Sequence, residues 1–209
     1  MRIAPAITLS LSLAGTAQAQ FPPEKLENLK VFPKDIPVRA LIDTMAGFTR
    51  ALGVRCTFCH VGEEGKPLST YDFKSDDKHT KEAARVMLGM VAAINGAQLG
   101  KLEHRHEPGI TVTCATCHRG VSEPRPLQQV LMIAYDSGGA DAAEKTYREL
   151  RERYYGRASY DFGDVPLADV ANALRQKSMT DALRFHALNL EFAPNSAFAQ
   201  RQAGQAYLA

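Results

Sequence analysis

Apolar side chains repeat at helical spacing in the segment that ends at Leu52. Four of them are separated by four, three and four positions: Leu41, Met45, Phe48 and Leu52. This spacing places them on one face of a helix. Asp35 and Pro37 supply a helix start, and Gly53 can adopt the left-handed conformation that ends a helix. The pattern therefore predicts a helix from this start to Leu52.

A second helix is expected after the polar loop 62–78. Three candidate N-cap residues precede it: Ser75, Asp76 and Asp77. It is predicted to run to about Ile94 and to end at Asn95-Gly96, and it carries Met87 and Met90 in its second half. Strand-like alternation is hard to find anywhere in the chain, so we expect an all-α protein.

The C-terminal part has a different character. The segment 122–126 contains two prolines and is the expected domain boundary. Five amphipathic helices are predicted beyond it: 127–135, 139–154, 166–176, 179–192 and 196–208. Four residues of this region resemble positions of the tetratricopeptide repeat: Ala182, Pro194, Gly204 and Tyr207. We therefore expect a tetratricopeptide-like helical region over 127–209.

The N-terminal residues 1–19 resemble a secretory signal peptide. Arg2 precedes an apolar run, and Ala17-Gln18-Ala19 forms a cleavage-type sequence before Gln20. The run is too short to span a bilayer, so no transmembrane segment is expected in the mature chain. No cysteine follows the signal closely, which argues against a lipid anchor there. The expected location is the periplasm.

Charge narrows the choice of partners. The formal net charge is +2, from 25 basic and 23 acidic residues without a long run of one sign. A nucleic-acid-binding protein normally carries a clear basic excess, so nucleic acid is excluded as an expected partner.

Two copies of one motif carry the chemistry. Cys56-Thr57-Phe58-Cys59-His60 and Cys114-Ala115-Thr116-Cys117-His118 both have the spacing of a c-type haem attachment sequence. The two thiols lie one turn apart, so each can add to one vinyl group of the porphyrin, and the adjacent His can bind the iron. The order of helix followed by motif occurs twice, which indicates an internal duplication. Two covalently bound haem groups are therefore expected.

Three other uses of the cysteines explain the pattern less well. A disulfide within Cys-x-x-Cys closes a very small loop and constrains the unfolded chain little. A zinc ribbon places its two pairs about fifteen to twenty residues apart, whereas 54 residues separate Cys59 from Cys114. A thioredoxin-like site needs a strand and helix context that the pattern does not predict. None of the three accounts for a His after each pair.

The sixth iron ligand decides between electron transfer and chemistry on a bound molecule. Met45 lies on the apolar stripe eleven residues before Cys56, and Met87 and Met90 precede the second motif. A methionine in such a stripe is most often a core residue. Its position before a haem motif, repeated before the second motif, favours a thioether ligand.

Further segments of the chain match one known family. They are Asn28-Leu29-Lys30-Val31, Pro33-Lys34-Asp35-Ile36-Pro37, the run from Met45 to Cys56, Ala84-Arg85-Val86-Met87-Leu88-Gly89-Met90, Asn95, and Val112-Thr113-Cys114 to Gly120. Over about 28–121 the chain resembles the cytochrome c subunit of photosynthetic reaction centres, and it is similar to one two-haem half of that subunit. The resemblance implies an all-α haem domain with loop-rich sites over 20–121.

The resemblance also implies residue roles. Met45 matches the methionine ligand of the first haem, and Met87 matches that of the second better than Met90, which stays an alternative one turn away. His106 is similar in place to a His that the family lends to another haem, but we expect His104 and His106 to be solvated loop residues. His79 and His186 are expected at the surface or in helix packing.

The sequence therefore predicts a non-enzymatic electron carrier with His60 and His118 as the proximal iron ligands. Its expected partners are redox proteins, including a membrane-bound electron-transfer complex, and a protein bound by the helical repeats. The alternative is a two-haem peroxidase or haem-based sensor with an open iron site.

Overall fold

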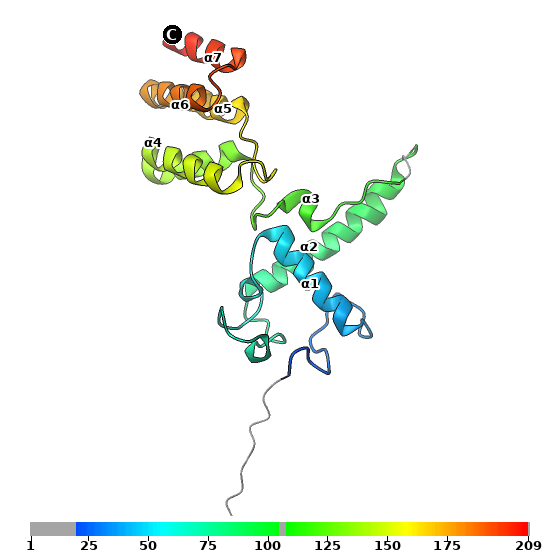
Figure 1. Cartoon of the computed structure of the whole chain (residues 1–209). Helices are drawn as coiled ribbons and strands as arrows, with labels where there is room; N and C mark the ends of the chain where they lie inside the picture. The colour runs from blue at the N-terminus through cyan, green and yellow to red at the C-terminus, as the bar shows by residue number, and fades with distance from the viewer. Residues whose placement is uncertain (1–19, 105–107, 209) are drawn as a thin grey trace, which may run out of the picture. The chain divides into compact units, whose positions relative to one another are not determined.

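The computed structural model describes residues 20–104 and 108–208. The expected signal segment 1–19 and His106 lie outside the described residues. The regular elements of these residues are all helices (Figure 1). In addition, one isolated β-bridge joins Val61 to Asp72. The expectation of an all-α protein is confirmed. None of the helices in 20–104 and 108–208 is both long and apolar enough to cross a membrane.

Contacts divide the chain into two compact units. One contains the described residues of 1–43 together with 56–89, and the other contains 44–55 together with the described residues from 90 onward. Both units combine segments that are distant in the sequence. The boundary expected at 122–126 stays a prediction.

Helix α1 (Val38–Leu52) follows the sequence pattern closely. It begins directly after Pro37, whose carbonyl accepts a hydrogen bond from the Leu41 amide at 3.1 Å. It ends at Gly53, which has φ = 66°. The amide of Val54 then donates to the carbonyl of Thr49 at 3.1 Å, which closes the helix as the left-handed stop predicts.

Helix α2 (His79–Ala93) ends within one residue of the predicted end, but the chain does not leave the helical path there. It continues into a π-helical turn, η3 (Ile94–Gln98), and a 3₁₀ turn, η4 (Leu99–Lys101). The Asn95 side chain donates to the Val112 carbonyl and accepts from the Val112 amide, both at 2.8 Å. The α-helix therefore ends within one residue of the predicted end, but Asn95 binds a distant segment of backbone inside a π-helical turn that the sequence did not predict.

The candidate N-caps of this helix serve other purposes. The helix begins at His79, and the Ser75 hydroxyl accepts from the Asp77 amide at 3.1 Å instead of capping it. Asp76 forms ion pairs with Lys30, Lys81 and Arg85 instead of capping the helix. The loop thus folds on itself before the helix starts.

The C-terminal helices α4 to α7 form a stack with its own core (Figure 1). Their bounds are α4 (Leu127–Tyr154), α5 (Asp164–Leu174), α6 (Met179–Phe192) and α7 (Ala197–Tyr207). Gly138 and Gly139 have non-helical backbone angles inside α4, which matches the two helices predicted on either side of them. Ser178 and Ser196 cap α6 and α7 by accepting from Asp181 and Ala199 amides.

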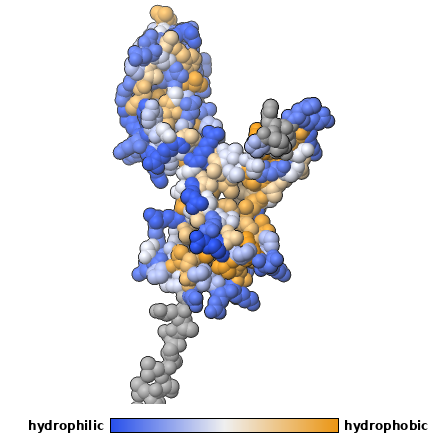
Figure 2. All heavy atoms as spheres, turned by 45° about the vertical axis from the view of Figure 1, so that its right-hand side comes forward, coloured by the Kyte–Doolittle hydropathy of each residue, from blue (hydrophilic) through white to orange (hydrophobic). Residues whose placement is uncertain are grey.

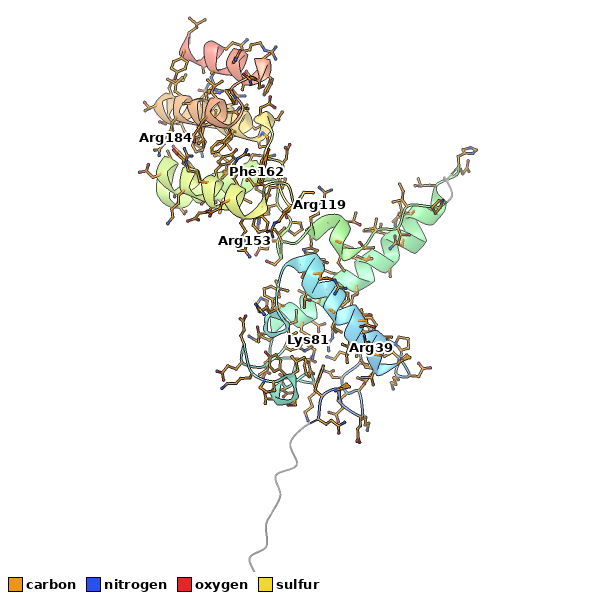
Figure 3. The ribbon with its side chains drawn as sticks, viewed as in Figure 1. Arg39, Lys81, Arg119, Arg153, Phe162 and Arg184 are labelled. Atoms are coloured by element: carbon orange, nitrogen blue, oxygen red, sulfur yellow. The ribbon has the colours of Figure 1, made fainter. Side chains whose placement is uncertain are left out.

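Fully buried side chains from all these helices except α7 meet in the main apolar cluster of this stack. Its largest members are Leu127, Leu131, Tyr147, Leu167, Leu174 and Phe185. Between α4 and α6, Arg184 binds Asp141 at 2.6 Å and Glu144 at 2.8 Å (Figure 3). The tetratricopeptide likeness stays a prediction. Ala182 is buried and Pro194 follows the end of α6, but Gly204 is exposed with open space around it.

Gly53 lies against the backbone of Gly120, two residues beyond the second motif. The Gly120 amide donates to the Ala51 carbonyl at 2.8 Å, and a Cβ on Gly53 would be 2.0 Å from the Gly120 oxygen. This contact needs glycine at position 53 because of both its positive φ and its closeness to another backbone. It ties the end of α1 to the segment that follows the second motif.

Replacing Gly53 with Ala should therefore destabilise the protein by about 2–4 kcal/mol, since the change adds backbone strain and a steric clash. Urea unfolding of the intact protein measures this. Gly204→Ala is the matched control, because it lies in a helix with nothing within 4 Å, and it should be neutral or stabilising by up to about 1 kcal/mol. Equal stability of the two variants would contradict the close approach.

Candidate functional site

The first motif forms one tight turn. Cys56–Phe58 is a 3₁₀ turn, η1, and the carbonyl of Cys56 accepts from the Cys59 amide at 3.2 Å and the His60 amide at 2.9 Å. The hydroxyl of Thr80, at the start of α2, donates to the carbonyl of Phe58. These bonds hold the two thiols and the imidazole on a single turn of backbone.

The second motif is a short helix, α3 (Cys114–His118). It follows Thr113, whose amide donates to the Thr116 hydroxyl at 3.0 Å, so the turn is closed at its N-terminal end. All four cysteines of the two motifs are free thiols. Neither motif forms the disulfide that was the first alternative use of these cysteines.

His118 has a defined orientation. Arg119 and Gly120 follow it with φ values of 49° and 87°, and these left-handed residues turn the chain back so that the Val121 amide donates to the His118 carbonyl at 2.9 Å. The Nδ1 atom of His118 then lies 2.9 Å from the Val121 carbonyl oxygen. Nδ1 donates in this bond, which leaves the lone pair of Nε2 available to a metal.

His60 has different surroundings. Its Nδ1 atom is buried without a hydrogen-bond partner among the described residues, and its ring packs edge-on against Phe73 at 4.9 Å between centroids. Burial, with the charges of Lys81 and Arg85, lowers the pKa of His60 to about 4. The neutral imidazole, which is the metal-binding form, is thus favoured at neutral pH. Burial also raises the pKa of the neighbouring Cys59 thiol.

An ion cluster lies beside the first motif. Asp76 binds Lys30 at 2.7 Å, Arg85 at 2.9 Å and Lys81 at 3.3 Å. Figure 3 marks Lys81 near the start of α2. Hydrogen bonds from Lys30 first, and from Asn28, Lys81 and Arg85, hold the pKa of the Asp76 carboxyl well below its usual value. The cluster joins the N-terminal segment to α2.

The segment that carries the motifs buries few side chains of its own. Among the described residues from 20 to 121, only Ala51 and Val121 are buried. Val86, Met87 and Met90 on α2 are exposed, and Figure 2 shows apolar surface on this part of the chain. Met45 on α1 is half-buried. A segment of this length normally needs an apolar core to remain folded.

The residues fit a covalently attached haem. The donor set contains two thiols and one imidazole per motif, with thioethers on the preceding helices, and His118 is already oriented for an iron ligand. The exposed apolar side chains suit a large apolar ring. In the described ranges no group of three or more His, Cys, Asp or Glu side chains is placed to hold a metal ion, which gives no support to the zinc alternative.

The remaining described histidines lie apart from this chemistry. His79 and His104 are exposed, as expected for surface residues. His186 is buried on α6 in the C-terminal stack, and neither of its ring nitrogens has a hydrogen-bond partner among the described residues. The sequence reading missed the supporting roles of Phe73, Thr80 and Lys81. No motif marks them, because they act through contacts that only the folded loop creates.

Comparison with known proteins supports the haem interpretation. The sequence model for the family described as photosynthetic reaction centre cytochrome C subunit matches residues 63–133. The photosynthetic reaction center cytochrome c subunit of Thermochromatium tepidum is 30% identical over 163 residues, which cover 73% of this chain and 34% of that relative. The chain is related to the reaction-centre cytochrome c subunits. No solved structure matches it.

The relationship has a definite extent. This chain spans about a third of the length of the reaction-centre cytochrome c subunit that it matches. The family match begins three residues after His60, so it includes the second motif and not the first. The relation supports an electron-carrying cytochrome with covalently bound haem c.

The Asp76 cluster generates a pH prediction for this relative of the reaction-centre cytochrome c subunits. Because the folded-state pKa of Asp76 is depressed, its stabilising effect is present above the unfolded-state pKa of about 3.9 and is lost as the pH falls below it. Asp76→Asn should therefore lower the urea midpoint at pH 7 and change it less at pH 3. Asp43→Asn, which removes a more exposed pair with Arg39, is the control and should show a smaller effect at pH 7.

Proposed function

We propose that this chain is an exported, periplasmic electron carrier with two covalently bound haem groups. The observation that carries the proposal is the pair of Cys-x-x-Cys-His turns, each with free thiols and a histidine at its end. The relation to the reaction-centre cytochrome c subunits supports it. The signal-like residues 1–19 support export.

The attachment residues have separate tasks in this proposal. Cys56 and Cys59 hold the first haem through thioether bonds, and Cys114 and Cys117 hold the second. His60 and His118 bind the two irons through Nε2. Bound haem supplies an iron that gains and loses one electron between the ferric and ferrous states.

Methionine side chains close the sixth position of each iron in the proposal. Met45 serves the first haem, and Met87 serves the second, with Met90 as the alternative. The exposed fractions of Met87 and Met90 are 45% and 46%, so exposure does not separate them. A thioether ligand raises the reduction potential and excludes other molecules from the iron, which suits electron transfer.

The proposed partners are redox proteins, including a membrane-bound electron-transfer complex. The C-terminal stack α4 to α7 has a core of its own, so it can present a stable surface to a partner protein while the haem segment carries electrons. Removal of the stack would then affect partner capture and leave the haem spectra intact.

The haem count tests the proposal directly. The protein expressed with the cytochrome maturation machinery should gain the mass of two haem groups, and Cys56→Ala/Cys59→Ala and Cys114→Ala/Cys117→Ala should each retain one. Intact-protein mass spectrometry measures this. A colourless protein, or one with the mass of the polypeptide alone, would contradict it.

Ligand variants test the methionine assignments. Met45→Ala and Met87→Ala should each abolish the thioether-to-iron absorption band near the red end of the spectrum for one haem and leave the other six-coordinate. Met90→Ala and the control Met179→Ala, a partly exposed methionine on α6, should leave both bands. Carbon monoxide binding by the reduced wild-type protein would instead favour the peroxidase or sensor alternative.

Removal of haem should unfold only part of the chain. Helices α1 to α3 lack a buried core of their own, whereas α4 to α7 have one. Circular dichroism of the quadruple Cys→Ala variant should show a partial loss of helicity, with a cooperative unfolding transition that remains from the C-terminal stack. Equal helicity with and without haem would contradict this.

A further inference from the structure

The two motif histidines differ at the nitrogen that faces away from the proposed iron. His118 Nδ1 lies 2.9 Å from the Val121 carbonyl oxygen. His60 Nδ1 is buried, and no described residue accepts a hydrogen bond from it. The two sites therefore offer different donors to their metals, although their motifs are alike.

The chain after each motif explains the difference. Val121 lies three residues after His118, and the residue at the same place after His60 is Glu63. The Glu63 carbonyl accepts instead from the Tyr71 hydroxyl at 2.9 Å and from the Lys66 amide at 3.2 Å. In the second motif the carbonyl three residues after the histidine therefore accepts from the histidine itself. In the first motif the corresponding carbonyl accepts from groups of the loop that follows.

This difference changes the electron donation of each imidazole. When Nε2 binds a metal, Nδ1 carries the proton, and a hydrogen bond from Nδ1 to a carbonyl makes the imidazole a stronger donor. A stronger donor stabilises the ferric state and lowers the reduction potential. His118 has this bond and His60 lacks it, so the bond lowers the potential only at the second motif.

Two cations with little exposure to water act in the same direction at the first motif. The side chains of Lys81 and Arg85 are only 12% and 11% exposed. Lys81 donates to the carbonyl of Phe73 at 2.9 Å, and the Phe73 ring packs against His60. Positive charge close to a haem ligand favours the reduced iron, because reduction lowers the positive charge of the site.

The neighbouring carboxylates offset these cations only in part. Asp76 and Glu82 pair with three cations, Lys30, Lys81 and Arg85. The carboxylates are 37% and 62% exposed, so water screens them more than it screens Lys81 and Arg85. At the second motif Arg119 is exposed and is screened in the same way.

We propose that the haem at Cys56 and Cys59 has the higher reduction potential and the haem at Cys114 and Cys117 the lower, so that a half-reduced chain holds its electron at the first motif. This inference rests on the proposed two-haem function. It assigns a direction to the carrier: an oxidising partner drains the first haem last, and a weak reductant fills it first.

A redox titration of the haem-loaded protein tests the assignment. Two components are expected, and Cys56→Ala/Cys59→Ala should retain only the lower one. Lys81→Gln and Arg85→Gln, made separately, should each shift the higher component downward and leave the lower one in place. Asp76→Asn should shift the higher component upward, because it removes the charge that offsets the cations.

Lys30→Gln is the matched control. It removes one positive charge from the same Asp76 cluster, but Lys30 is more exposed, so it should shift the higher component less than Lys81→Gln does. Hyperfine-shifted proton signals of the axial ligands in a half-reduced wild-type sample provide a second assignment that needs no variant.

The possible failures can be told apart. A protein mass with fewer than two haem groups would refute the proposed function before any titration. With two haem groups present, the inference is wrong if Cys56→Ala/Cys59→Ala retains the higher component, or if the half-reduced sample holds its electron on the second haem. It is also wrong if Lys81→Gln and Arg85→Gln shift the lower component, or if they shift the higher component no more than Lys30→Gln does.

Discussion

The segment from residue 20 to Val121 depends on apolar contacts that its own side chains supply only in small part. Among the described residues there, Ala51 and Val121 alone are buried, and Val86, Met87 and Met90 on α2 face outward. In a protein, this surface has to be covered or the helices lose most of their stabilisation, because isolated helices of fifteen residues are marginal in water. In the proposed function, two covalently attached porphyrin rings would cover this surface and could not dissociate from it.

The constraint explains why polar contacts are so prominent in this segment. Asn95 binds the Val112 backbone, Thr80 binds the Phe58 carbonyl, and Asp76 gathers three cations around the start of α2. Each of these contacts orients backbone near a motif. The C-terminal stack shows the opposite balance, because its buried Leu131, Tyr147 and Phe185 form a core and its ion pairs lie at the surface.

Sequence reasoning succeeded where the cause of a structure is local. Gly53 ends α1 by its left-handed backbone, and the serine caps Ser178 and Ser196 begin α6 and α7 within one or two residues of the predicted starts. It did not reveal the long-range role of Asn95, whose side chain binds the Val112 backbone inside a π-helical turn. The same limit applies to the site: the motifs reveal the cysteines and histidines, but the Phe73 ring against His60 is visible only after the loop 61–72 has folded.

The difference between His60 and His118 can be traced to two short segments of sequence. After His118, Arg119 and Gly120 adopt left-handed conformations. Glycine at position 120 adopts its positive φ without steric strain. The chain therefore turns back, and the Val121 carbonyl reaches Nδ1 of His118. After His60 the chain runs straight into the bridge between Val61 and Asp72, and Gly62 packs closely beneath the Tyr71 ring. Tyr71 then binds the carbonyl of Glu63. Two motifs with the same spacing thus give their histidines different hydrogen-bond surroundings, and the cause lies in the three residues that follow each motif.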